Sequence, residues 1–226
     1  MTHSLEVSVE SHGKTILVSA ESYEAKFVID EPFAWTRQRC DFAAFAFLPI
    51  AMRLKRPLRI VDRGDTVTAK NAMRLSQVWQ TWHPTLFHSI DVGFAEETPM
   101  PIGSGELVLF SGGVDSTFNL LNKRLRNEEQ PTALTVHGFD YKFNDEVRFQ
   151  ALLEKTQPFC SHVAKQRIIA HTNIYDLYNR LGINAGLGHG FALASCLFLF
   201  SDQFARGEIS ADYSRAQDFL VFPWGT

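Results

Sequence analysis

The sequence predicts an α/β protein in which a parallel-sheet, nucleotide-binding domain over residues 99–226 follows a smaller α+β domain over residues 1–98. Strands and helices alternate after Glu106, which is typical of a parallel sheet with helical crossovers. Before residue 98 a hairpin pattern is mixed with helices. The ten residues 96–105 between them hold two prolines and two glycines, which favours a linker.

Composition narrows the class of protein. The chain has 226 residues, 45% of them hydrophobic and 21% charged, with a formal net charge of −3. No apolar run approaches the roughly 20 residues needed to cross a bilayer, so we expect no membrane association. The first residues lack a signal-peptide pattern, so we expect a cytoplasmic location. The low net charge makes nucleic acid an unlikely partner. Three isolated cysteines predict free thiols and neither zinc nor a redox pair.

The first domain shows patterns of strands and helices but no catalytic constellation. We expect a hairpin from 5–9 and 15–18, a third strand at 25–29, a buried helix at 41–54 containing Pro49, a strand at 58–61, a turn at 62–65, a helix at 69–82 capped by Thr68 and a strand at 87–95. Clustered histidines, cysteines and carboxylates are missing here. We therefore expect this domain to serve substrate binding, a partner or a homodimer.

The second domain alternates strand and helix patterns. We expect strands at 106–110, 133–138, 167–171 and 207–211, helices ending near Leu125, from 144 to 156 and from 191 to 204, and a further strand or extended tail at 219–222. The loop between the first of these strands and its helix reads Ser111-Gly112-Gly113-Val114-Asp115-Ser116-Thr117. This strand-loop-helix unit is the centre of the predicted site.

The loop has the chemistry of an anion site. Gly112 and Gly113 allow backbone N–H groups to converge on a phosphate. Ser116 and Thr117 add hydroxyl groups at a helix start, where the helix dipole favours negative charge. A carboxylate at Asp115 is repelled by phosphates unless a divalent cation lies between them. The loop therefore predicts a phosphate ligand together with Mg²⁺.

The six residues Ser111 to Ser116 resemble the PP-loop of the ATP pyrophosphatases, the adenine nucleotide alpha hydrolase-like superfamily, which includes GMP synthetase and argininosuccinate synthetase. The resemblance implies a HUP-like, Rossmann-like fold, ATP cleaved between its α and β phosphates, and AMP transferred to an acyl or carbonyl oxygen. It also implies nucleotide binding along the loop and at the end of the second strand, where the backbone of Val136, His137 and Gly138 would lie against adenine. Other phosphate loops do not fit, since Ser8 stands where the first glycine before Gly13-Lys14-Thr15 would be needed. The alternative is an ordinary glycine turn.

Further candidates follow the other strands, because the carboxyl ends of parallel strands share one crevice. Asp212 is the expected second carboxylate near Mg²⁺, so Asp115 and Asp212 are the metal candidates and, with Ser116, the catalytic ones. His137 and His171 are each either a general base, a metal ligand or a local hydrogen-bonding residue. His189, between two glycines at a helix start, either holds a phosphate or carboxylate or caps the helix.

Residues 188–214 and the final Pro-Trp-Gly-Thr loosely resemble the 7-cyano-7-deazaguanine synthase branch. That branch carries zinc-binding cysteines near its C-terminus, and this sequence has none. Its members also continue beyond the point where this sequence stops, so the chain is a fragment or its acceptor site is built differently. We expect an enzyme that adenylates a carboxylate or amide oxygen of a small-molecule or protein acceptor before a nucleophile such as ammonia attacks. The alternative is a nucleotide-binding regulatory or accessory module; a tRNA-modifying enzyme is disfavoured by the lack of an extended basic surface.

Overall fold

The alternating side chains of the first thirty residues form an antiparallel meander. In the computed structural model, which describes residues 3–99, 103–126 and 128–210, strand β1 (Leu5–His12) pairs with β2 (Thr15–Ala20), and β2 pairs with β3 (Tyr23–Ile29). Buried and more exposed side chains alternate along most of these strands, and the last three residues of β1 are all exposed. The predicted hairpin and third strand are confirmed, and one face of this part of the sheet is open to solvent.

The rest of residues 1–98 contains α1 (Asp41–Leu54), β4 (Leu58–Gly64), α2 (Thr66–Trp82) and β5 (Val92–Glu97). The bounds predicted for α1 are confirmed, and Pro49 lies inside it. The predicted turn at 62–65 is wrong, because β4 continues through a register shift to Gly64. The predicted cap is also wrong: the carboxylate of Asp65, not Thr68, accepts from the N–H groups of Val67 and Thr68. Strand β5 begins five residues later than the predicted 87.

Strands and helices alternate in residues 99–226 as predicted, except that two helices, α5 and α6, follow one another. They are β6 (Glu106–Leu109), α3 (Val114–Leu125), β7 (Thr132–His137), α4 (Glu146–Val163), β8 (Gln166–Thr172), α5 (Ile174–Arg180), α6 (Ala185–Phe198) and β9 (Arg206–Glu208). Helix α4 continues through Pro158 beyond its predicted end, and α5 was not predicted. The strand or tail predicted at 219–222 lies outside the described residues.

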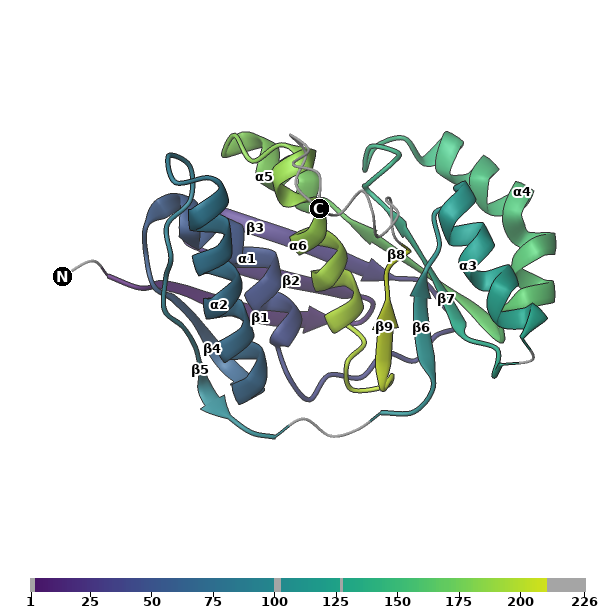
Figure 1. The fold of residues 1–226 in the computed structure, drawn as a ribbon, viewed down its shortest axis with the longest axis horizontal. Coiled ribbons are helices and arrows are strands. Elements are labelled where there is room, and N and C mark those ends of the chain that lie inside the picture. Colours follow the sequence, from purple (N-terminus) through teal and green to yellow (C-terminus); the bar gives the residue numbers. More distant parts are fainter. Residues whose placement is uncertain (1–2, 100–102, 127, 211–226) are drawn as a thin grey trace.

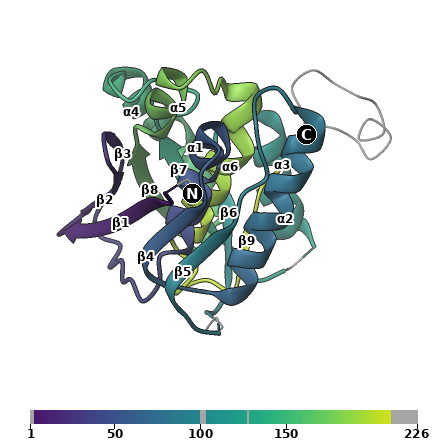
Figure 2. The same cartoon turned by 90° about the vertical axis from the view of Figure 1, so that its left-hand side faces the viewer.

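All nine described strands belong to one sheet in the order β5-β4-β1-β2-β3-β8-β7-β6-β9 (Figure 1). The sheet is mostly parallel, since only β1–β2, β2–β3 and β3–β8 pair antiparallel. Figure 2 views it from the edge formed by β5. The strands of residues 1–98 and 99–226 meet at β3–β8, so both parts of the chain share one α/β sheet. Whether residues 1–98 form a separate domain stays a prediction.

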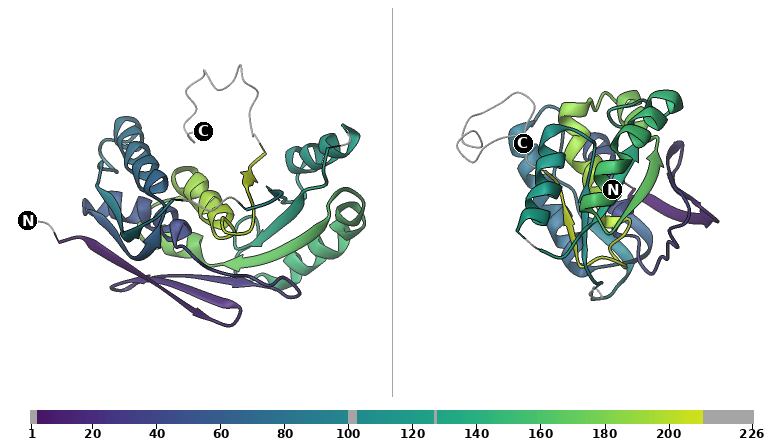
Figure 3. Two further views of the ribbon diagram at one scale, coloured as in Figure 1. Left: turned by 90° about the horizontal axis from the view of Figure 1, so that it is seen from below. Right: turned by 90° about the vertical axis from the view of Figure 1, so that its right-hand side faces the viewer.

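Helices cover the two faces of the sheet unequally. Side chains alternate along β6: Leu107 and Leu109 belong to the larger core, while Val108 and Phe110 belong to a smaller core with Leu120 of α3. Helices α1, α2, α5 and α6 pack on the first face, and α3 and α4 pack together on the second. Figure 3 shows α1, α2 and α6 side by side on one side of the twisted sheet.

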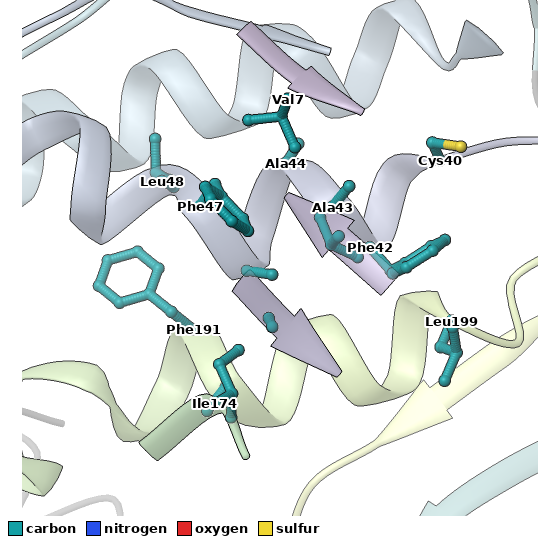
Figure 4. Close-up of a cluster of buried hydrophobic side chains, with 14 of the residues drawn as sticks. Val7, Cys40, Phe42, Ala43, Ala44, Phe47, Leu48, Ile174, Phe191 and Leu199 are labelled. Carbon is teal, nitrogen blue, oxygen red and sulfur yellow. The ribbon is translucent and has the colours of Figure 1, made fainter. Parts of the chain in front are cut away.

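Helix α1 lies at the centre of the larger core. It is apolar on all sides and is buried from Asp41 to Met52, as its composition predicts. Figure 4 shows Phe42, Phe47 and Leu48 of α1 together with Phe191 of α6 and Val7 of β1. The core therefore contains side chains from both parts of the chain.

A buried ion pair also joins the two parts. Nε of Arg39 donates to a carboxylate oxygen of Asp202 at 3.0 Å, and the other oxygen accepts from the backbone N–H of Gln38 at 2.7 Å. The hydroxyl of Tyr178 donates to the carbonyl of Ala46 at 2.9 Å.

The three cysteines are buried free thiols, as predicted: Cys40, Cys160 and Cys196. Burial raises the pKa of Cys196 to about 12. None of the described helices is long and apolar enough to span a membrane.

Candidate functional site

Strand β6 is the switch point of the parallel part of the sheet. The chain steps from β6 to β7 and β8 on one side, and then returns to place β9 on the other side of β6. This arrangement, order β8-β7-β6-β9, is compatible with a Rossmann-like fold. In such sheets ligands bind beyond the carboxyl end of the strands at the switch point. The loop that follows β6 is therefore at the position where the topology predicts a site.

The loop makes a tight turn into α3. Gly112 has φ +79°, and a Cβ on it would lie 2.9 Å from Leu152 and 3.2 Å from Thr156 of α4. Glycine is therefore favoured by conformation and by space. Gly113 is the N-cap of α3, and its N–H donates to the hydroxyl of Ser111 at 3.3 Å. The predicted glycine-rich turn between strand and helix is confirmed.

The start of α3 presents unpaired donors. Within the described residues, the backbone N–H groups of Val114, Asp115 and Ser116 make no hydrogen bond to the protein, as is usual in the first turn of a helix. Val114 is 84% exposed, and Ser111, Gly112, Gly113 and Asp115 are also exposed. Accessible N–H groups and the positive end of the helix dipole both favour an anion at this position.

The hydroxyl groups of the loop differ in their surroundings. Ser116 is only 6% exposed, and its hydroxyl donates to the carbonyl of Gly113 at 3.1 Å and lies 3.4 Å from the hydroxyl of Ser111. The N–H of Thr117 donates to the same carbonyl at 3.0 Å, and its side chain is half-buried. In this arrangement Ser116 holds the turn together, whereas Ser111 lies on the exposed side of the loop.

The end of β7 is packed against β8. Val136 is half-buried, while His137 and Gly138 are buried. Gly138 has φ +110°, and a Cβ on it would lie 1.8 Å from the carbonyl oxygen of Thr172. Its N–H donates to the carbonyl of Tyr141 at 3.1 Å. The contact with Thr172 alone accounts for the glycine, without a ligand.

His137 and His171 lie side by side, as expected for residues at the carboxyl edge of the sheet. Their Nδ1 atoms are 3.1 Å apart. His137 is stacked on Phe149, with ring centroids 4.3 Å apart, and lies 3.5 Å from the carboxylate of Glu146. Burial, followed by the charge of His171, lowers the pKa of His137, so this ring favours the neutral form near neutral pH. The two rings and Glu146 form a compact group of potential metal ligands.

The prediction that His189 begins a helix is wrong. Helix α6 begins at Ala185, where the side chain of Asn184 accepts from the N–H of Leu187, so His189 lies beyond the first turn. Its Nδ1 is hydrogen-bonded to the hydroxyl of Tyr175, and burial raises the pKa of that hydroxyl. His189 therefore does not lie at a helix start, and its binding of a phosphate or carboxylate stays a prediction.

Asp212, the second carboxylate of the prediction, lies outside the described residues. The chain just before it is anchored to α3, because the side-chain amide of Asn119 donates to Glu208 at 2.9 Å and to Ser210 at 3.4 Å. Lys123, one turn further along α3, contacts Glu208 at 2.7 Å and Glu106 at 2.8 Å. These contacts hold β9 and Ser210 beside α3.

Sequence reasoning missed three groups around the histidine pair. They are the carboxylates of Asp30 and Glu146 and the backbone carbonyl of Lys142. The start of α4 was predicted near residue 144. Because Glu146 is the first residue of this helix, its position in the crevice could have been predicted as well. Asp30 is 141 residues from His171, and no local pattern in the sequence connects the two.

Comparison of the chain with protein-family models, with curated proteins and with solved structures gave no match. The resemblance of the loop to a PP-loop therefore stays a prediction, and the chemistry of the site is inferred from its own residues.

Proposed function

We propose that the chain is an ATP-binding enzyme of the PP-loop class, which cleaves ATP to AMP and pyrophosphate and adenylates a carboxylate or amide oxygen of its acceptor. The observation that carries the proposal is the loop Ser111–Thr117 at the switch strand β6, with three N–H groups at the start of α3 that have no partner in the described part of the chain. A polyphosphate is the common biological ligand that fits such a position.

Each loop residue has a defined role in this proposal. The N–H groups of Val114, Asp115 and Ser116 and the hydroxyl of Ser111 bind the phosphates. Asp115 is exposed in the first turn of α3, and its carboxylate would hold Mg²⁺ against the phosphates, with Asp212 as the second carboxylate. Mg²⁺ would neutralise the charge on the phosphates. Because hydrogen bonds within the loop hold its shape, catalysis would come mainly from positioning and charge stabilisation.

Residues 1–98 would supply the binding surface for the acceptor or for a partner. Near the end of α1 and the middle of α2 lies a depression of about 280 Å³, lined by Lys55, Met73 and Gln77 among others. It has no grouping of catalytic side chains, so we assign it to binding and keep the chemistry at the loop. The acceptor is a small molecule or a protein, and the proposal is compatible with a homodimer and with a cytoplasmic location.

Product analysis tests the proposal. The full chain is incubated with ATP labelled on the α or γ phosphate, Mg²⁺ and a panel of carboxylate and amide acceptors. AMP and pyrophosphate are the expected products. Production of ADP and phosphate alone would refute the adenylating activity. Tight ATP binding without turnover would instead support the alternative, a nucleotide-binding regulatory or accessory module.

Two loop variants test the roles of the side chains. Asp115→Asn should remove most of the Mg²⁺ dependence of ATP binding, because it removes the charge that attracts the metal. Ser111→Ala should weaken ATP binding by about 0.5–1.5 kcal/mol, the net contribution of one hydrogen bond. Asp176→Asn, an exposed first-turn acid of α5, and Ser11→Ala, an exposed serine of β1, are the matched controls. Unchanged affinity and metal dependence in Asp115→Asn would mean that the loop is only a structural turn.

A further inference from the structure

Two imidazole rings face each other at the carboxyl edge of the sheet. His137 of β7 and His171 of β8 are paired in register on neighbouring parallel strands, so both side chains point to the face covered by α4. Their Nδ1 atoms are 3.1 Å apart, and only 1% of the His137 side chain is exposed. The pair lies at the end of the strands but is distinct from the phosphate loop.

The hydrogen bonds on the far side of each ring fix the tautomers. Nε2 of His137 lies 2.9 Å from the carbonyl oxygen of Lys142, and Nε2 of His171 lies 3.2 Å from a carboxylate oxygen of Asp30. A carbonyl and an ionised carboxylate only accept hydrogen bonds, so both Nε2 atoms carry the proton. A neutral ring protonated at Nε2 has a lone pair at Nδ1. The two lone pairs therefore face the same small space, and either a proton or a metal ion must lie between them.

A third ligand atom completes the group. A carboxylate oxygen of Glu146, the first residue of α4, lies 3.5 Å from Nδ1 of His137, and all three ligand atoms lie within 4.8 Å of one another. In a tetrahedral zinc site with bonds of about 2.0–2.1 Å, neighbouring ligand atoms are about 3.3 Å apart. The two distances from Nδ1 of His137, 3.1 Å to Nδ1 of His171 and 3.5 Å to the Glu146 oxygen, fall on either side of this value.

We infer that Nδ1 of His137, Nδ1 of His171 and the carboxylate of Glu146 bind a divalent transition-metal ion of the zinc type. Two imidazoles and one carboxylate favour zinc and its neighbours over Mg²⁺, which prefers oxygen ligands alone. Asp30 and the carbonyl of Lys142 orient the rings, as outer-shell groups do in zinc proteins. With the carboxylates of Glu146 and Asp30, a divalent ion is fully neutralised.

Among the described residues this group offers three ligands, which leaves a fourth coordination position for a water or a ligand molecule. The side chain of Glu146 is 64% exposed, so the metal is reached from the solvent side of α4. Closed structural zinc sites have four protein ligands, whereas three protein ligands and an open position allow a water or ligand molecule to bind. The ligands come from β7, β8 and α4, and Asp30 follows β3, so the ion also ties these four elements together.

Cobalt binding tests the inference without ATP, so its failure is separate from that of the proposed function. The full chain is treated with a chelator and titrated with Co²⁺, whose visible absorption reports tetrahedral coordination, and Zn²⁺ is then added in competition. Glu146→Gln should weaken binding at least about tenfold, and Asp30→Asn about 10- to 100-fold, as found for outer-shell partners. Glu154→Gln, an exposed acid on the same helix, should bind as the parent chain does.

Glu146 is exposed, so its replacement should leave the fold intact. Circular dichroism of each variant without metal would separate a loss of binding from unfolding. If the chelated parent chain takes up neither Co²⁺ nor Zn²⁺, the two rings share a proton instead and the inference is wrong. It is also wrong if Glu146→Gln and Asp30→Asn bind cobalt as tightly as the parent chain.

Discussion

Replacing Gly138 with alanine gives the sharpest test of how the end of β7 is built. The residue has φ +110°, and the added Cβ would lie 1.8 Å from the backbone oxygen of Thr172 on the neighbouring strand. Both clashing groups belong to the main chain of the sheet, so no side-chain rotation relieves the contact. We therefore expect Gly138→Ala to push β7 and β8 apart at the histidine pair.

The magnitude follows from two costs. A non-glycine residue held at a disfavoured positive φ costs about 1–3 kcal/mol. Overpacking a well-filled site costs about 1–3 kcal/mol more. The sum of about 2–6 kcal/mol is a large part of the roughly 5–15 kcal/mol by which a protein is stable. At about 2–4 °C per kcal/mol for a chain of this size, the unfolding midpoint should fall by about 4–24 °C.

Thermal and urea unfolding of three variants would measure this effect. Gly182→Ala is the matched control, since Gly182 has φ +70° but a Cβ there meets nothing within 4 Å. The stability of Gly182→Ala should fall only by the conformational cost of the positive φ. Gly190→Ala, in α6 with open space around it, should be neutral or stabilising by up to about 1 kcal/mol. Equal stability of Gly138→Ala and Gly182→Ala would refute the clash, and a stable Gly138→Ala that no longer binds ATP would assign the glycine to nucleotide binding.

Three further outcomes follow from the buried contacts. Asp202→Ala leaves the charge of Arg39 buried without its main partner and should cost about 3–5 kcal/mol in urea unfolding; a loss below about 1 kcal/mol would contradict this. Leu120→Ala leaves a cavity in the smaller core under α3 and should lower the free energy of unfolding by about 2–5 kcal/mol in the same assay. For Glu208, burial is outweighed by the hydrogen bonds from Lys123 and Asn119, which lower its pKa below 4.5. The ionised Glu208 side chain therefore contributes its full stabilisation above pH 4.5, and this stabilisation is lost as the pH falls through the lowered pKa of the folded protein. Lys123→Met should remove part of it, so that the stability of the variant falls less steeply at acid pH.

Much of the fold could be predicted because its local signals agree. The alternation over 5–29 and the apolar run of α1 determine their elements directly. The failures come from packing between elements. Gly188 was interpreted as part of a helix start, but a Cβ on it would lie 2.6 Å from Tyr178 of α5, so the glycine serves close packing of two helices. Helix α5 has only seven residues, too few to give a clear periodicity.

The candidate site was predicted where a general rule of topology applied and missed where a distant contact was needed. Parallel strands end at one edge, and this rule alone brings His137 and His171 together. The burial of Ser116 and the partner Asp30 depend on tertiary contacts that no spacing in the sequence shows. The same limit explains why the pairing of β3 with β8 was not anticipated.

That pairing determines the order in which the chain can complete its structure. The backbone N–H of Lys26 in β3 donates to the side chain of Asn173, 147 residues later, so β3 has no neighbour on this side until β8 has been synthesised. During translation the hairpin and α1 can form early, but β3 then exposes an unpaired strand edge, which can pair with other chains. Pairings over such long separations slow folding, because loop closure precedes the gain from contact. A nascent chain stalled before residue 166 should therefore need protection by a chaperone, and release from that chaperone should coincide with the emergence of β8.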